Sequence, residues 1–149
     1  MDAHVIAIGA DHGGYRLKTT LVAFLRDAGH DVCDLGADNP DRVDYPDYAH
    51  KVCAEVIAGR ARFGVLVCGT GVGMAIAANL HPEIRCAQVA EATTARLTRA
   101  HNDANVLALG GRLIGEEAAF DILRAFLSTE YEGGRHNQRL AKLTPKELA

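Results

Sequence analysis

Residues 65–79, VLVCGTGVGMAIAAN, place a cysteine directly before a glycine-rich loop. Cys68 ends an apolar run, and Gly69, Gly71 and Gly73 follow before a helical pattern resumes. Glycines between a strand and a helix let backbone N–H groups approach an anion, whose charge the helix dipole favours. A helix N-terminus also favours a thiolate over a thiol. Cys68 is therefore either an inert strand residue, as free cysteines usually are, or a reactive thiol held over an anion-binding loop.

Met74, the residue after this loop, separates it from three known loop types. A P-loop carries lysine and then serine or threonine after its last glycine. A dinucleotide fingerprint carries glycine or alanine at this place, and a cysteine phosphatase loop carries arginine there. The dinucleotide interpretation keeps one supporting feature, because Glu91 lies where a ribose-binding acid would stand. A tight structural turn is the alternative to anion binding.

An acid and an imidazole stand side by side in DHGGYRLK, residues 11–18. Asp11 or His12 could simply cap the helix that follows, while the glycines make the turn. A cap needs only one polar residue, however. The pair at the carboxyl end of a predicted strand also suits proton transfer or the binding of sugar hydroxyls.

Two further polar motifs lie nearer the C-terminus. RAHNDAN, residues 99–105, places His101 and Asn102 at the end of a helix, beside the amino end of the next strand. Both residue types suit a helix C-terminus; if they are functional, they reach the site of a neighbouring subunit. GGRHNQR, residues 133–139, places Arg135 and Arg139 on one helix face. They form either a solvated basic surface or two convergent ligands for a phosphate.

Short apolar runs alternate with helical patterns along the chain, and these elements must position the motifs. The runs predict strands at residues 5–8, 31–35, 63–67, 85–89 and 106–109. The helical patterns cover residues 15–28, 48–58, 74–80, 92–101 and 116–127, with one more short helix in the tail. This alternation predicts an α/β fold, a Rossmann-like three-layer sandwich with a five-stranded parallel sheet, in a single domain of residues 1–149. Ligands of such sheets bind beyond the carboxyl ends of the strands.

Composition excludes several classes of function. The chain has 149 residues and a net charge of −3 with no basic block, which argues against nucleic acid and anionic membranes as partners. It shows no signal peptide, no run long enough to span a bilayer and no CxxC pair among its four cysteines, so we expect a soluble cytoplasmic protein with reduced thiols. The seven histidines have no metal-ligand spacing, and no metal is expected. We expect four of them at solvent or at edges: His4, His30, His50 and His81.

Five motifs stand in order between residues 6 and 143: GADHGGYRLK, DYPDYA, VCGTGVGMAIAAN, HNDANVLALGGR and YEGGRHNQR. This combination resembles the ribose-5-phosphate isomerase type B family, which also contains allose-6-phosphate and galactose-6-phosphate isomerases. The resemblance implies a cofactor-free aldose–ketose isomerase acting on ribose 5-phosphate and ribulose 5-phosphate in the pentose phosphate pathway. The six-carbon sugar phosphates are an alternative substrate class. Outside this class, the alternative is a nucleotide-binding regulatory module with Glu91 on a ribose.

Catalytic roles follow from this resemblance. It makes Cys68 the base that moves a proton between C1 and C2, with Thr70 supporting it through hydrogen bonding. It also implies that Asp11 and His101 open the furanose ring. Backbone N–H groups of the loop hold the enediolate oxygen; they belong to Gly69, Gly71, Val72 and Gly73. Part of the family uses a glutamate after the loop in place of the cysteine, and Met74 places this chain in the cysteine type.

The resemblance also implies a homodimer or homotetramer with active sites at subunit interfaces. It assigns substrate or phosphate binding to a further group of residues: His12, Tyr45, Asn102, Arg112, Arg135 and Arg139. Of these, it implies that His12 and the two tail arginines bind the phosphate and that Tyr45 lines the site. It further implies that the partner chain supplies His101, Asn102 and Arg112. We expect the C-terminal segment, about residues 131–149, to pack on or reach a partner subunit.

Overall fold

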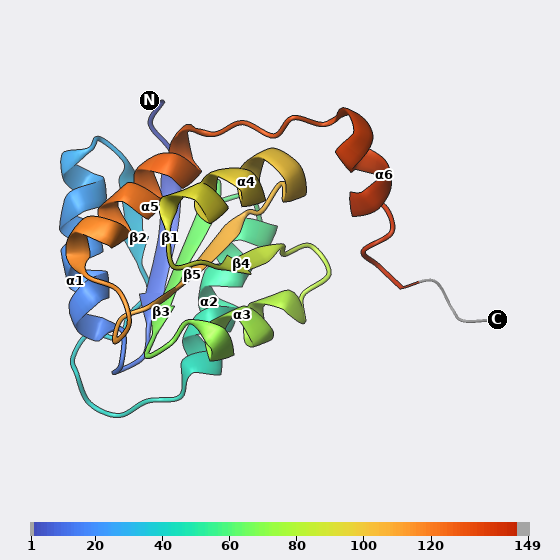
Figure 1. The fold of residues 1–149 in the computed structure, drawn as a ribbon. Coiled ribbons are helices and arrows are strands. Elements are labelled where there is room, and N and C mark those ends of the chain that lie inside the picture. The colour runs from blue at the N-terminus through green and yellow to red at the C-terminus, as the bar shows by residue number, and fades with distance from the viewer. Residues whose placement is uncertain (1, 146–149) are drawn as a thin grey trace.

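The computed structural model describes residues 2–145 and confirms the predicted α/β fold. Five parallel strands form one sheet in the order β2-β1-β3-β5-β4, with helices on both of its faces (Figure 1). The strands are β1 (Val5–Ala10), β2 (Asp31–Asp34), β3 (Phe63–Cys68), β4 (Cys86–Gln88) and β5 (Val106–Gly110). The helices are α1 (Tyr15–Asp27), α2 (Tyr45–Ile57), α3 (Val72–Asn79), α4 (Ala92–Asn102), α5 (Glu116–Ser128) and α6 (Asn137–Leu140), and η1 (Gly134–His136) is a 3-10 turn.

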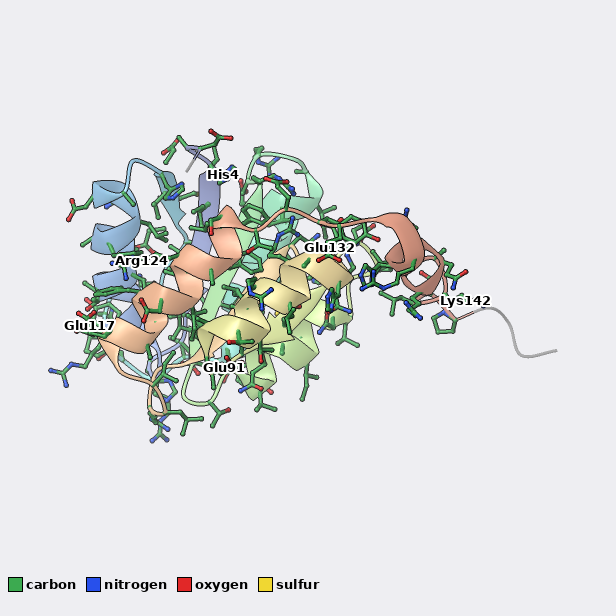
Figure 2. All side chains as sticks on the ribbon, turned by 45° about the horizontal axis from the view of Figure 1, so that its top comes forward. His4, Glu91, Glu117, Arg124, Glu132 and Lys142 are labelled. Carbon is green, nitrogen blue, oxygen red and sulfur yellow. The ribbon has the colours of Figure 1, made fainter. Side chains whose placement is uncertain are left out.

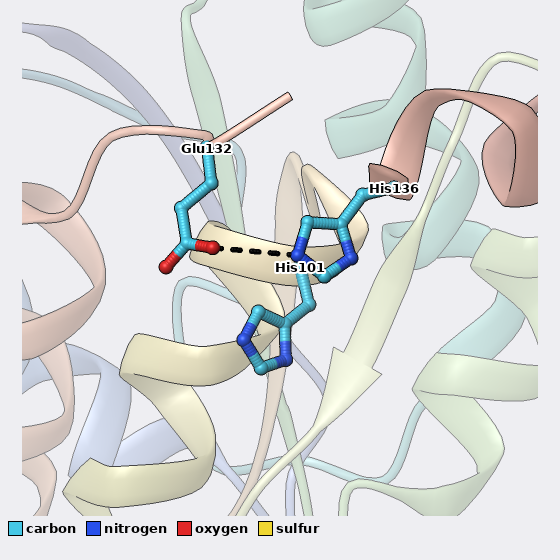
Figure 3. Close-up of side chains that lie close together, drawn as sticks. All are labelled: His101, Glu132 and His136. Carbon is cyan, nitrogen blue, oxygen red and sulfur yellow. Dashed lines mark hydrogen bonds and ion pairs between the residues drawn. The ribbon is translucent and has the colours of Figure 1, made fainter. Parts of the chain in front are cut away.

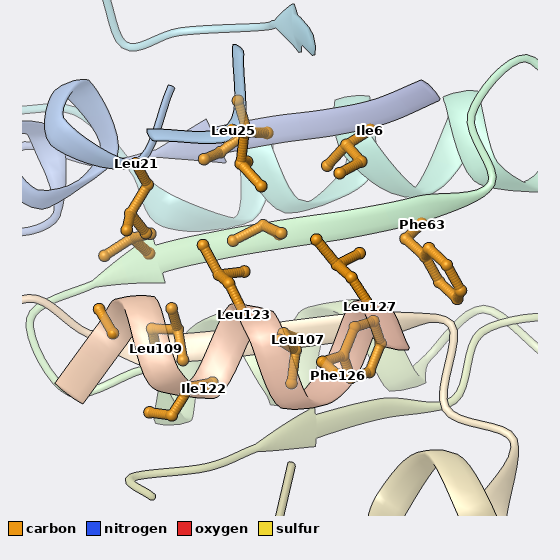
Figure 4. Close-up of a cluster of buried hydrophobic side chains, with 14 of the residues drawn as sticks. Ile6, Leu21, Leu25, Phe63, Leu107, Leu109, Ile122, Leu123, Phe126 and Leu127 are labelled. Carbon is orange, nitrogen blue, oxygen red and sulfur yellow. The ribbon is translucent and has the colours of Figure 1, made fainter. Parts of the chain in front are cut away.

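The central strands are apolar throughout because both faces of the sheet are covered. Successive residues point to opposite faces. The face under α1, α4 and α5 holds the larger core (Figure 4), which includes Ile6, Leu21, Leu107, Leu123 and Phe126. The face under α2 and α3 holds a smaller core, which includes Ala7, Val52, Leu66, Met74 and Ala108. Cys68 packs in this second core, so its side chain lies on the α2 and α3 side of the sheet.

Several element boundaries differ from the sequence prediction. α2 begins at Tyr45 and not at residue 48, because Pro46 suits the first helical turn, where its missing N–H is not needed. β3 runs one residue further than predicted and takes Cys68 into the sheet. β4 is shorter than residues 85–89, and it is an edge strand paired only with β5. Within residues 2–145, no helix combines the length and apolarity needed to cross a bilayer.

His30 is buried, contrary to the expectation that it lies at solvent or at an edge. It stands just before β2, where its Nδ1 accepts the N–H of His4 at 3.1 Å and its ring stacks against the His4 ring. Burial lowers the pKa of His30, and the neighbouring His4 adds to the effect. The chain turns back sharply after α1, and this turn places the ring inside.

Residues after α5 form an arm that leaves the body of the sandwich (Figure 1). The arm includes η1 and α6, which confirms the short helix predicted in the tail. Its start is tied to the end of α4, since the Glu132 N–H donates to Ala100 O at 3.0 Å. α6 buries none of its residues. Packing of this arm on a partner stays a prediction, and residues 146–149 of the predicted segment lie outside the described residues.

Candidate active site

The carboxyl ends of β1, β3 and β5 lie side by side, and the loops that follow them are joined through their backbones. The Gly111 N–H donates to Cys68 O at 2.8 Å, and the Arg112 N–H donates to Gly69 O at 3.0 Å. β2 and β3 flank β1 on opposite sides, so the chain reverses its direction across the sheet between β1 and β3. In α/β sheets, ligands bind at this kind of crevice.

Glycines permit the close approach of these loops. A Cβ at Gly14 would lie 2.2 Å from Val67 O, a distance that no other residue could accept. The Asp11 N–H donates to the same oxygen at 3.2 Å. Gly71 has a φ of +82°, in the left-handed region that favours glycine, and it turns the chain from β3 into α3. The glycines of DHGGYRLK and of the loop after Cys68 therefore shape this edge of the sheet.

Cys68 is the last residue of β3 and is only 4% exposed. Its Sγ accepts the Gly71 N–H at 3.1 Å, directly before the first turn of α3. The donor and the helix N-terminus both stabilise negative charge on the sulfur. Burial raises the pKa of Cys53 to about 11 and also raises the pKa of Cys86, so both stay protonated at neutral pH. Cys68 lies at the carboxyl edge beside a backbone donor and a helix N-terminus, and this position makes it the candidate for a reactive thiol.

Thr70 and Gln88 hold the shape of the glycine loop. Thr70 Oγ1 accepts the Val72 N–H at 3.2 Å, and the carbonyl of Thr70 accepts from Gln88 Nε2 at 3.1 Å. The Thr70 hydroxyl thus supports the loop, whereas the resemblance assigned it to Cys68. Gln88 was missed by the sequence analysis, although it ends β4 and therefore lies at the same edge of the sheet.

Asp11, His12 and Tyr45 also lie at this edge. Asp11 is buried, and its Oδ1 accepts the Gly14 N–H at 3.1 Å. His12 Nδ1 accepts the Val43 N–H at 3.3 Å, which places the proton of the neutral ring on Nε2 and makes that atom a donor. The Tyr45 ring covers Gly73, where a Cβ would lie 2.6 Å from Tyr45 Cζ. The structure therefore brings all three residues to the edge that holds Cys68.

The position of Arg112 differs from the expectation. The resemblance assigned it to a partner's site, but it follows β5 and so lies at the same edge as Cys68 of its own chain. A Cβ at Gly69 would lie 3.3 Å from Arg112 Nη1. The guanidinium therefore covers the glycine loop of the same chain, where it adds positive charge beside the backbone N–H groups.

The four remaining predicted residues lie at the opposite end of the sheet: His101, Asn102, Arg135 and Arg139. α4 starts near the carboxyl edge and ends where β5 begins, at the amino edge. Figure 2 marks the two ends of this helix by Glu91 at its start and Glu132 beside its end. Both arginines are exposed on the arm. A single chain does not bring these four residues to Cys68.

Glu91 has a structural role. Its carboxylate oxygens accept the N–H groups of Thr93 and Thr94, both at 2.7 Å, which makes it the N-cap of α4. Hydrogen bonds from the side chain and backbone of Thr94 lower the pKa of Glu91, so it stays ionised in the cap. The nucleotide-binding alternative needed this carboxylate for a ribose, and it loses that support.

A sequence profile of the family described as Ribose/Galactose Isomerase matches residues 6–143. The chain belongs to this family. Ribose-5-phosphate isomerase B of Escherichia coli (strain K12) is 47% identical over 142 residues, which cover 95% of each chain. The ribose 5-phosphate isomerase structure from Thermotoga maritima has a TM-score of 0.93 at 48% identity, covering 95% of this chain and 97% of the other. The structure of ribose-5-phosphate isomerase B from Mycoplasma genitalium with bound ribulose-5-phosphate has a TM-score of 0.88 at 38% identity. The match covers 93% of this chain and 92% of the other.

Membership confirms the fold and the enzyme class that the five motifs predict: the chain is a sugar-phosphate isomerase. The match includes both the edge around Cys68 and most of the arm. At the amino end the match also includes Glu132 and His136, to which the sequence analysis assigned no role. His136 is buried, its Nε2 lies 3.3 Å from Glu132 Oε2, and its ring stacks on His101. The one signal in the sequence was the position of His136 directly after Arg135.

Proposed function

We propose that this isomerase interconverts ribose 5-phosphate and ribulose 5-phosphate, with Cys68 as the base. The observation that carries the proposal is the 3.1 Å contact between Cys68 Sγ and the Gly71 N–H, inside a loop of backbone donors. The thiolate takes the C2 proton of the open-chain aldose, the C–H electrons form a C1–C2 double bond, and the charge moves to O1. A proton then passes from O2 to O1, and the thiol returns its proton to C1, which leaves the ketose carbonyl at C2.

The loop supplies the stabilisation that this step requires. The Gly71 and Val72 N–H groups already donate to Cys68 Sγ and Thr70 Oγ1, so we assign the negatively charged enediolate oxygen to the N–H groups of Gly69 and Gly73. A preorganised donor at such an oxygen is commonly worth about 3 kcal/mol. The Arg112 guanidinium over Gly69 adds positive charge at the same place. We assign ring opening to Asp11 and His101. Ring opening precedes proton transfer because the furanose has no free carbonyl.

We further propose that a second chain completes each site, since His101, Asn102 and the arm arginines do not reach Cys68 of their own chain. α3 exposes an apolar row beside the glycine loop: Val72 is 49%, Ile76 61% and Leu80 76% exposed. A contiguous apolar row on a helix that also carries the loop is typical of a subunit interface. In a symmetric dimer, contact through this face brings the partner's arm, with Arg135 and Arg139, toward the phosphate of the substrate.

The names of the relatives support the five-carbon substrate. The Escherichia coli relative is a ribose-5-phosphate isomerase B, and the Mycoplasma genitalium structure holds ribulose-5-phosphate. The proposal is tested by a coupled assay with ribose 5-phosphate and with allose 6-phosphate, each with and without EDTA. We expect a higher kcat/KM for ribose 5-phosphate and no loss of activity with EDTA. Turnover of neither sugar contradicts the proposal, and loss of activity with EDTA contradicts metal-free proton transfer.

A further inference from the structure

His101, Glu132 and His136 gather at the end of α4 (Figure 3). Each offers one donor atom, and these three atoms lie within 4.8 Å of one another. His136 Nε2 lies 3.3 Å from Glu132 Oε2. The rings of His101 and His136 stack with their centroids 4.6 Å apart and their planes at 19°. Within residues 2–145, no other three side chains of metal-ligating type come together in this way.

The fold holds these donors in place. Arg99 is almost completely buried and joins the end of α4 to the start of the arm, with Nη1 donating to Ala104 O at 2.7 Å and Nε to Thr129 O at 3.3 Å. The Glu132 backbone is tied to α4, and the His136 side chain is only 9% exposed. Two of the three donors therefore belong to a fixed part of the arm and not to a freely moving surface.

We propose that this cluster binds a divalent transition metal ion of the zinc class. Two imidazoles and a carboxylate form a ligand set that such ions take, with a fourth position open to water. Metal–ligand bonds of about 2.0–2.2 Å in tetrahedral geometry place neighbouring ligand atoms about 3.4 Å apart. The Glu132 and His136 donors already have a separation of 3.3 Å. Two stacked rings lie in nearly parallel planes, so their nitrogens do not point at one common ion. One ring must therefore turn, and we assign this turn to His101, because it is only partly buried.

The expected consequence is reversible inhibition, and this part of the inference rests on the proposed function. His101 is the imidazole that we assign to ring opening in the partner's site. A nitrogen bonded to a metal ion cannot exchange a proton with the sugar. Ligation also fixes the arm next to Arg135, in the arrangement that holds the ion. The metal therefore competes with catalysis and takes no part in it.

Cobalt(II) tests the site by absorption, because tetrahedral Co²⁺ has visible bands and a thiolate ligand adds a near-ultraviolet charge-transfer band. On titrating the full chain with Co²⁺, we expect visible bands that saturate at one ion per chain, no thiolate band, and displacement by Zn²⁺. Glu132→Gln and His136→Ala should each weaken Co²⁺ binding by at least about tenfold, since even second-shell changes cost that much. Should the buried His136→Ala variant fail to fold by circular dichroism, Glu132→Gln, with its exposed side chain, decides the test.

Two matched variants control for other metal ligands. His81→Ala removes one ring of a separate imidazole pair, in which His50 Nδ1 and His81 Nε2 lie 2.8 Å apart. Cys68→Ala removes the thiol proposed as base. Both variants should bind Co²⁺ like the unchanged protein. Absence of saturable binding, unchanged binding in Glu132→Gln, or loss of binding in either control overturns the proposal.

Inhibition is measured separately. Zn²⁺ should slow ribose 5-phosphate turnover, EDTA should restore it, and Glu132→Gln should require at least about tenfold more Zn²⁺ for the same inhibition. Zn²⁺ inhibition that is the same in Glu132→Gln contradicts the link between the ion and His101. A protein that binds Co²⁺ at the cluster but turns over no sugar phosphate would overturn the proposed function and leave the metal site intact.

Discussion

The two ends of the sheet present chemistry in different ways. At the carboxyl edge, Cys68 and the loop N–H groups are fixed by strands and by backbone hydrogen bonds between neighbouring loops. At the amino end, Arg135 and Arg139 are long side chains on an arm that leaves the body of the protein. Groups on the backbone can form a complete anion site within one chain. Side chains on a projecting arm are instead in a position to serve another chain.

The largest effect is expected from removing the thiol at the carboxyl edge. Cys68→Ala should lower kcat by roughly 10²- to 10⁴-fold, because a positioned base contributes about that much to proton transfer. KM should change little, since the loop and the cationic residues remain. Cys33→Ala, which removes a half-buried thiol on β2, is the matched control. A Cys68→Ala enzyme with near wild-type kcat would exclude the thiol as base.

Mixing two inactive variants tests whether the ends of two chains share a site. On the proposed shared site, Cys68→Ala and His101→Ala dimers should each be nearly inactive, but a mixed dimer should contain one site with both residues intact. Random exchange of subunits in a symmetric dimer should restore about one quarter of wild-type activity. The measurement is ribose 5-phosphate turnover after co-refolding or co-expression. No recovery, despite mixed dimers seen by mass spectrometry, would place both residues in one chain's site.

Removing the arm cations should affect binding more than chemistry. Arg135→Ala and Arg139→Ala should each raise KM by about 10- to 100-fold, because a charge-assisted hydrogen bond to phosphate is worth roughly 1.5–3 kcal/mol. Steady-state kinetics check this, and kcat should fall less than KM rises. Arg124→Ala is the matched control, since Arg124 is an exposed arginine on α5 paired with Asp121 at 3.0 Å. An equal loss in the control would assign the effect to net charge.

The smallest effect concerns stability and comes from His30, near the amino ends of the strands. Burial lowers the pKa of His30 below its ordinary value of 6.5, so the unfolded chain binds the proton more readily than the folded one. Its contribution to stability is therefore complete above about pH 6.5 and falls as the pH drops below that value. Thermal unfolding between pH 7.5 and 5.5 should show this, and His30→Gln should flatten the profile.

The sequence predicted the fold and the carboxyl edge well, because both follow from local rules. The alternation of apolar runs and helical patterns indicates a parallel sheet, and residues that follow its strands meet at one edge. This rule placed Asp11 and Cys68 at the same edge. The same rule also predicts Arg112 at this edge, but the family resemblance assigned Arg112 to the partner chain. The earlier start of α2 also has a local cause, because Pro46 suits the first turn of a helix.

Contacts between distant segments were beyond prediction from one sequence. His101 and His136 belong to different segments, and their stacking depends on how the arm leaves α5. The burial of His30 likewise depends on a neighbour in the N-terminal segment, His4. Patterns of spacing describe residues on one element and carry no information on where another element crosses it. The cluster of potential metal ligands was missed for this reason.

The outward course of the arm has a consequence for dilute solutions. A monomer would keep its sheet and its thiol, yet on the proposed shared site it would lack the arm cations and the His101 imidazole of a second copy. Far below the dimer dissociation constant, the concentration of paired chains falls with the square of total protein. On the proposed shared site, specific activity should therefore decline on dilution while the circular dichroism spectrum stays the same.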